Sequence, residues 1–318
     1  MKGILFFLIF STGLFCQEFE RPWFTGPILA PAGHTVAPGK TNYQPYLFVT
    51  NNYSPEESWV IDPFVQITRG ITSHIDLKFE TQAFFTFKED QIGSGLSDFS
   101  VILGFQAMED NLDGWEPDLR ITLGETFPTG QFERLNPNKL GADATGSGSF
   151  ETAVSFNFQK LFHIKGVQWL RPRLFLRYTI PSPVTVHDFN TYGGGFGTDG
   201  KVHPGNTFSG ILAFEYSMTR NWVWALDIQA IYASKTTFSG RRGIDIVGRT
   251  AAHGNGKINR VGIPASLGSG KSVQWSYAPA LEYNFNDWFG VIGGVWFTGA
   301  TKNSMEFISY VLSTNLVF

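Results

Sequence analysis

The stretch IDLKFETQAFFTF, from Ile75 to Phe87, alternates apolar and polar side chains along most of its length. Charged residues separate Ile75, Leu77 and Phe79, and the alternation returns toward Phe87. Successive side chains of a β-strand point to opposite faces, so this period of two predicts a strand with one apolar and one polar face. The stretch exceeds the about 5–6 residues of an ordinary globular strand, and it suffices for the about 9–11 residues with which a tilted strand crosses a bilayer.

The same alternation recurs along the whole chain, for example at 99–105 and 170–180, whereas helical spacing is scarce. We therefore expect an all-β fold of about twelve strands. They lie near residues 41–53, 57–69, 73–89, 96–108, 117–127, 149–161, 169–180, 206–218, 221–234, 272–285, 288–300 and 305–318.

The composition indicates that part of the apolar surface faces something other than water. Of the 318 residues, 16% are charged and 16% are aromatic, with 31 Phe. Typical soluble domains carry about 25% charged residues. The formal net charge is only −3, so nothing in it points to nucleic acid, and we expect no nucleic-acid partner.

The predicted connections differ in length according to their order in the chain. Those after even-numbered strands are short or modest, such as GIT at 70–72 and ND at 286–287. The long, Gly-rich connections follow the fifth, seventh and ninth strands, at 128–148, 181–205 and 235–271. Loops sorted in this way are typical of outer-membrane barrels, which have short periplasmic turns and long extracellular loops. In a soluble β-sandwich, nothing makes the length of a loop depend on whether it follows an odd or an even strand.

The N-terminus is typical of a secretory signal peptide, which we place at residues 1–16. Lys2 precedes an apolar run from Ile4 to Phe10 that is too short for a spanning helix. Cys16 is the only cysteine in the sequence. Two fates are open for it: removal with the signal peptide, which we favour, and lipid modification, which the bulky Phe15 before it disfavours.

The predicted final strand alternates Ile308, Tyr310 and Leu312 and ends on Phe318. A terminal aromatic residue resembles the signal by which outer-membrane proteins are recognised for assembly, so we expect the barrel-assembly machinery and outer-membrane lipid as partners. Closure of the last strand on the first removes free sheet edges. We therefore predict a transmembrane, antiparallel up-and-down β-barrel over residues 41–318, located in the bacterial outer membrane.

Residues 94–162 contain the motifs SGLSDFSVILGFQAMED, PDLRITLGETFPTGQF and GSGSFETAVSFNFQKLF. Their Gly-x-x-Asp strand start, the loop entry at Phe127–Gly130 and the Gly-Ser-rich return resemble the repeated strand pattern of outer-membrane barrels labelled as transporters of the phenol meta-degradation pathway. The resemblance implies uptake of small compounds, aromatic or apolar, and supplies no catalytic residues. The segment 21–39 departs from the usual start of that family.

If the apolar strand faces contact lipid, the polar faces line the lumen. The lumen-lining candidates are Asp76, Lys78, Glu80, Asp118, Arg120, Glu151, Arg171, Arg173, Arg177, Glu215, Asp227 and Glu282. Charges of both signs at this density require pairing or water, because an isolated buried ion is costly. The row of three arginines on the seventh strand has two interpretations, a guide for anionic solutes or structural pairing with neighbouring acidic residues, and we favour the second.

Residues 17–40 are rich in proline and apolar side chains, including Trp23, Pro27 and Pro31. Two placements are open for this N-terminal segment. It could fold into the lumen and plug or gate it, or it could lie on the barrel as a periplasmic tail.

Two enzyme interpretations are disfavoured. ASLGSGKS, from Ala265 to Ser272, matches the spacing of a phosphate-binding loop, which must open a helix. The alternation that follows, with Pro279, instead predicts a strand. The six histidines show no zinc spacing and no nucleophile pattern. We expect no enzyme activity, no cofactor and no metal.

The sequence thus predicts an outer-membrane channel for passive uptake of small solutes. The alternative is a surface-exposed structural or adhesin-like barrel with a closed lumen. A continuous wet path would favour the channel, and a packed lumen with paired charges would favour the alternative.

Overall fold

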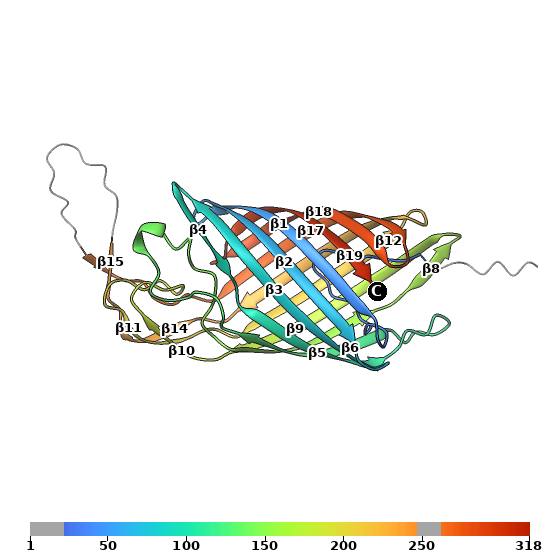
Figure 1. The fold of residues 1–318 in the computed structure, drawn as a ribbon, viewed down its shortest axis with the longest axis horizontal. Helices are drawn as coiled ribbons and strands as arrows, with labels where there is room; N and C mark the ends of the chain where they lie inside the picture. Colours follow the sequence, from blue (N-terminus) through green and yellow to red (C-terminus); the bar gives the residue numbers. More distant parts are fainter. Residues whose placement is uncertain (1–21, 247–261) are drawn as a thin grey trace, which may run out of the picture.

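Twelve long antiparallel strands close into a barrel (Figure 1) in the computed structural model, which describes residues 22–246 and 262–318. The predicted signal peptide, residues 1–16, lies outside the described residues. The barrel strands are β1 (Thr41–Ser54), β2 (Ser58–Gly70), β3 (Ile75–Lys88), β5 (Phe99–Met108), β6 (Asp118–Phe127), β7 (Glu151–Gln159), β9 (Gln168–Pro181), β12 (Thr207–Ser217), β13 (Trp222–Ala233), β17 (Ser272–Asn286), β18 (Phe289–Lys302) and β19 (Glu306–Val317).

Each barrel strand pairs with its neighbours in chain order, and β19 pairs with β1 to close the ring. Leu47 of β1 stands opposite Leu312 of β19 at this seam. The predicted all-β, up-and-down barrel of twelve strands is therefore confirmed, with strand ends within a few residues of those expected. The stretch after ASLGSGKS is strand β17, so a helix is absent where a phosphate-binding loop requires one.

Among the described residues, seven further strands and one short helix extend the barrel or lie in its loops. β4 (Gln91–Leu96) pairs with β3, and β8 (Phe162–Lys165) pairs with β9. The long loops, for which no strand was predicted, contain η1 (Pro137–Lys139), β10 (Val184–His187), β11 (Asp199–His203), β14 (Thr237–Arg241), β15 (Ile244–Ile246) and β16 (Gly262–Pro264). β10, β11 and β14 form a small sheet around Val184, Val186 and Val202. Each of these strands is too short to show the alternation of apolar and polar residues in the sequence.

The outward face of the barrel is apolar. Large side chains such as Phe79, Leu123, Leu212 and Leu312 are exposed on strands all round the ring. An exposed apolar surface of this extent requires a lipid environment, and a closed barrel satisfies the backbone hydrogen bonds there. The fold is that of an outer-membrane β-barrel.

Within the part of the chain that the structure describes, no helix is long and apolar enough to cross a membrane.

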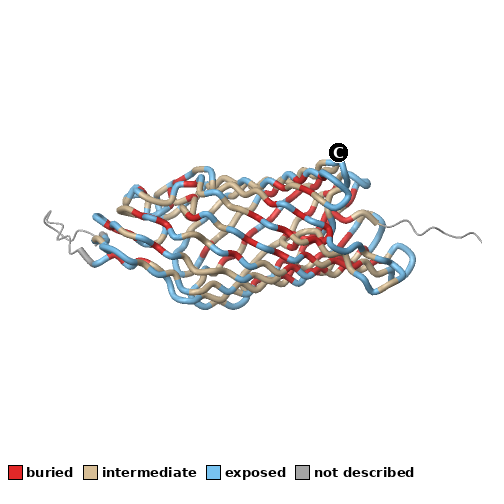
Figure 2. Tube along the Cα trace, turned by 90° about the horizontal axis from the view of Figure 1, so that it is seen from below, coloured by how far each residue is buried: buried red, intermediate tan, exposed pale blue. Residues whose placement is uncertain are grey.

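Buried residues gather in the half of the barrel nearer the C-terminus (Figure 2). This is also the end where the short turns lie, between β2 and β3, β12 and β13, and β17 and β18. We call it the short-turn end; the long loops with β10, β11 and β14 extend from the opposite end (Figure 1). The short-turn end is where the N-terminal segment meets the strands.

Candidate functional site: the barrel lumen

The described part of the N-terminal segment, residues 22–40, lies inside the barrel. It enters beside Asn284, whose Nδ2 donates to the carbonyl of Trp23 at 2.7 Å. At its apex the N–H groups of Leu29 and Ala30 donate to the two carboxylate oxygens of Asp227 at 3.2 and 3.1 Å. The segment then returns toward the short-turn end and continues into β1. It therefore forms a loop inserted from the short-turn end.

The return limb, residues 33–36, is held by the opposite wall. The N–H of Thr35 donates to Gln106 at 2.6 Å, and the N–H of Val36 donates to the Asp76 carboxylate at 3.1 Å. Prolines at 22, 27, 31 and 38 keep the segment out of helix and sheet, so its backbone groups need other partners. Carboxylates and amides of the barrel wall provide them.

Small residues make room for the apex. Ala213, Ala225 and Ala278 are fully buried on the inner wall beneath it. A Cβ added to Gly294 would lie 2.6 Å from Cδ1 of Ile28, so the absence of a side chain there permits the contact. Ile28 itself is only 5% exposed.

Two of the three predicted arginines share one buried carboxylate. Glu215, which is fully buried, accepts from Arg171 at 2.7 Å and from Arg173 at 2.9 Å. Arg173 also donates to the carbonyl of Ala30 at 3.1 Å, and Arg171 lies over the Phe24 ring, 4.2 Å from its centroid. These guanidinium groups hold the N-terminal segment and are fixed in turn by Glu215.

Further candidates also pair with each other. Arg120 binds the Asp76 carboxylate at 2.6 Å, and Lys78 binds Glu80 at 2.6 Å. Glu282 accepts the N–H groups of Thr25 and Gly26. These contacts agree with the structural interpretation of the lumen charges at the short-turn end.

The remaining candidates lie apart from this group. Asp118 accepts the N–H of Asp110 at 2.9 Å at the mouth of the short-turn end. Glu151, at the start of β7, lies toward the long loops. Arg177 lines the lumen cavity.

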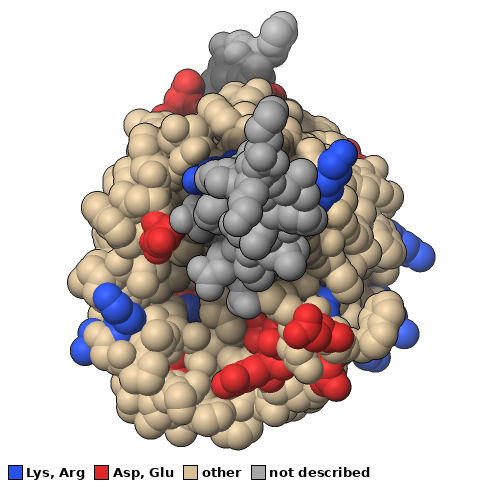
Figure 3. Space-filling model, turned by 90° about the vertical axis from the view of Figure 1, so that its right-hand side faces the viewer, with Lys and Arg blue, Asp and Glu red and all other residues tan. Residues whose placement is uncertain are grey.

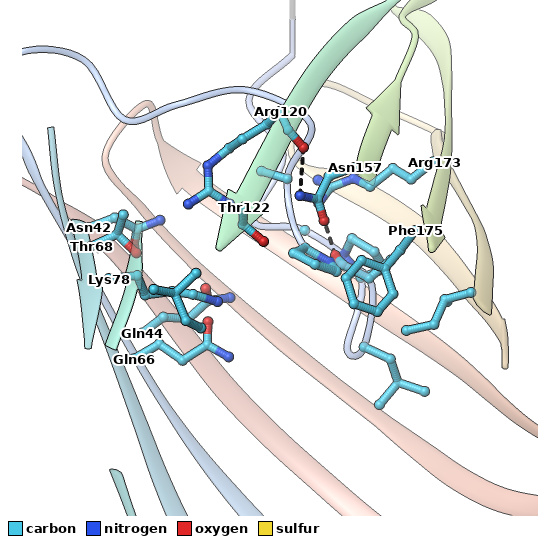
Figure 4. A pocket seen from close by; sticks show the side chains of 18 of the residues that line it. Asn42, Gln44, Gln66, Thr68, Lys78, Arg120, Thr122, Asn157, Arg173 and Phe175 are labelled. Atoms are coloured by element: carbon cyan, nitrogen blue, oxygen red, sulfur yellow. Dashed lines mark hydrogen bonds between the residues drawn. The ribbon is translucent and has the colours of Figure 1, made fainter. Parts of the chain in front are cut away.

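A cavity of about 410 Å³ remains in the lumen beside the N-terminal segment. Asn42, Gln44, Gln66 and Lys78 stand on one side of it, and Phe175 stands on another (Figure 4). Sequence reasoning selected charged residues only and missed these amides. They occupy the same inward-facing parity as the charges, which is the signal that could have found them.

His34 is another residue that sequence reasoning did not select. It lies in the return limb, with its Nδ1 3.1 Å from Nε2 of Gln159, and it lines the lumen cavity. Enclosure within the barrel, followed by the charges of Arg171, Arg173 and Arg120, lowers the pKa of His34 below 6.5.

Among the described residues, no group of three or more His, Cys, Asp or Glu side chains is placed to hold a metal ion.

No protein-family model matches the chain, and no curated protein is similar to it in sequence. Among solved structures, the COG4313 outer membrane channel from Pseudomonas putida F1 is 12% identical, with a TM-score of 0.65 over 92% of this chain and 100% of that one. The NanC porin is 9% identical, with a TM-score of 0.47 over 86% of this chain and 98% of that one. The first of these similarities supports the outer-membrane barrel fold.

Proposed function

We propose that this protein is an outer-membrane channel through which small solutes diffuse, and that its N-terminal segment restricts the lumen. The observation that carries the proposal is the lumen cavity, lined by polar side chains such as Gln44, Gln66 and Arg177. A barrel that served only as a surface scaffold would not need a polar cavity beside a segment held by so many contacts. The neighbours named above as channels agree with this role.

The solutes that we propose are small molecules with an apolar or aromatic body and a polar group. The resemblance of residues 94–162 to barrels of the phenol meta-degradation pathway supports this class. The cavity supports it as well, because Phe64 and Phe175 line it together with Gln44 and Gln66. Aromatic rings would pack on the former, and hydroxyl or carbonyl groups would bond to the amides.

Liposome swelling tests the channel. The refolded barrel would be compared with Ile28→Asp, in which an unpaired carboxylate replaces a buried apolar side chain at the apex, and with the matched control Ala37→Asp, where the side chain is exposed. We expect slow swelling for the parent and the control, and faster swelling with a larger size limit for Ile28→Asp, because the cost of burying an unpaired carboxylate displaces the apex. A series of phenols and sugars of similar size would report the solute class.

A closed-lumen surface barrel is the second candidate, favoured by the paired charges around Glu215 and Asp76. It predicts no swelling with either variant, from protein shown by its resistance to SDS at room temperature to be a folded barrel.

A further inference from the structure

A second cavity touches the return limb of the N-terminal segment at His34 and Thr35. It has a volume of about 410 Å³, and Ser73, Gln106, Asp110 and Leu161 are among the residues that line it. These residues belong to, or lie beside, the turns of the short-turn end, so we call this cavity the vestibule. Seen from that end, Asp and Glu side chains gather over one part of the surface (Figure 3).

Two residues line both cavities, His34 and Arg171. The lumen cavity and the vestibule therefore approach each other at these two side chains. They come from different elements, since His34 belongs to the N-terminal segment and Arg171 belongs to β9.

The two limbs of the segment differ in how they meet the wall. The entry limb is fixed through Thr25, whose N–H bonds to Glu282 and whose carbonyl accepts from Asn315 at 2.9 Å. Its hydroxyl donates to Asn284 at 2.8 Å, which leaves the side chain without freedom to move. Thr25 is only 5% exposed.

The return limb is fixed through its backbone instead. A Cβ added to Gly33 would lie 2.6 Å from Cβ of Gln159, so the chain lies directly against β7 at that point. The His34 ring makes one hydrogen bond, to Gln159. Arg171, by contrast, is held by Glu215 and by the Phe24 ring. The imidazole is thus held by fewer contacts than the guanidinium.

We propose that solutes pass from the lumen cavity to the vestibule between His34 and Arg171, and that the His34 side chain sets the size limit of this exit. The inference rests on the proposed channel function. A passing solute meets an imidazole, which both donates and accepts hydrogen bonds, and a guanidinium edge that only donates. The exit therefore favours solutes that carry a hydroxyl, carbonyl or carboxylate oxygen.

Single cysteines test the exit in planar bilayers. The chain from Gln17 onward contains no cysteine, so His34→Cys provides a unique thiol. A charged methanethiosulfonate reagent would be added on the short-turn side, and intact mass would report the extent of modification. The matched control is Ala37→Cys, an exposed position of the N-terminal segment that lines neither cavity. His34→Ala and His34→Trp, measured without reagent, test whether the size of the side chain at position 34 limits the conductance.

We expect modification of His34→Cys to remove most of the current, a higher conductance for His34→Ala and a lower one for His34→Trp. Current that is unchanged in fully modified His34→Cys would overturn the exit, as would a loss confined to Ala37→Cys. If the parent barrel conducts and the His34 variants all match it, the exit is wrong and the channel stands. A parent barrel without any current overturns the channel and the exit together.

Discussion

Glu215 is the residue on which the short-turn end of the lumen depends. Its two carboxylate oxygens neutralise Arg171 and Arg173, and these guanidinium groups then hold Phe24 and the carbonyl of Ala30. All three charged side chains are at least nine-tenths buried. Removal of one partner from a buried ion pair leaves an uncompensated charge.

Glu215→Gln should therefore destabilise the barrel by about 3–5 kcal/mol, the range for breaking a buried ion pair. Lys88→Gln is the control, because its partner Glu56 is 68% exposed and such surface pairs contribute about 0–1 kcal/mol. Urea-dependent unfolding in lipid vesicles, followed by tryptophan fluorescence, gives both values. Equal losses in the two variants would contradict the central position of Glu215.

At this scale the alternation along each strand allows a prediction of which residues face inward. It did not predict which charges pair. Arg171 and Glu215 are 44 positions apart in the chain, and their contact depends on strand register. His34 was missed for another reason: nothing in an isolated loop histidine indicates that a barrel will enclose it.

The elements divide into those with a visible period and those without one. Every long barrel strand was predicted because it alternates over nine or more residues. β10 and β11, with four and five residues, lie in loops for which no strand was predicted, and their packing around Val186 comes from contacts between loops. The two placements of the N-terminal segment could not be separated by sequence, because its partners, such as Asp227, are distant in the chain.

The N-terminal segment should bind the lumen less tightly in acid. The docked His34 has a lowered pKa, so the docked state favours the neutral imidazole. The contribution of neutral His34 to docking of the segment is complete above the ordinary pKa of 6.5. It is lost as pH falls below that value, because the released segment takes up a proton. Arg120, Arg171, Arg173 and Glu215 surround the ring and remain in every variant compared.

Swelling rates at pH 7.5 and pH 5 would measure this effect. We expect acid to raise the swelling rate more for the parent than for His34→Gln. This variant retains the carboxylates that hold the segment, but its glutamine side chain does not titrate. The same acid response in both proteins would show that the carboxylates alone govern release.

At the scale of the whole molecule, the barrel reverses the usual distribution of apolar and charged residues in a globular protein. Apolar residues such as Leu212 face out, and fully buried carboxylates such as Asp227 and Glu282 face in. An apolar exterior of this kind is stable in a bilayer and not in water. The predicted recognition of the final strand by the assembly machinery through Phe318 stays a prediction.

Leu212→Arg, at the centre of β12, should cost about 2–4 kcal/mol in a bilayer, the penalty for a cation at mid-depth on a barrel exterior. Met305→Arg is the control, since its side chain is 46% exposed against 41% for Leu212 but lies at the outer β18–β19 turn. Folding equilibria in vesicles would compare them. A similar small cost at both positions would contradict a lipid-facing exterior at Leu212.

Single-channel conductance of the refolded barrel, with and without residues 17–36, tests the central claim most directly. The proposed channel predicts discrete, small conductance from the full chain and a clear rise after truncation, because the segment that narrows the lumen is gone. Silence in both forms, from protein shown to be a folded barrel, would contradict the claim and leave a surface barrel with a closed lumen.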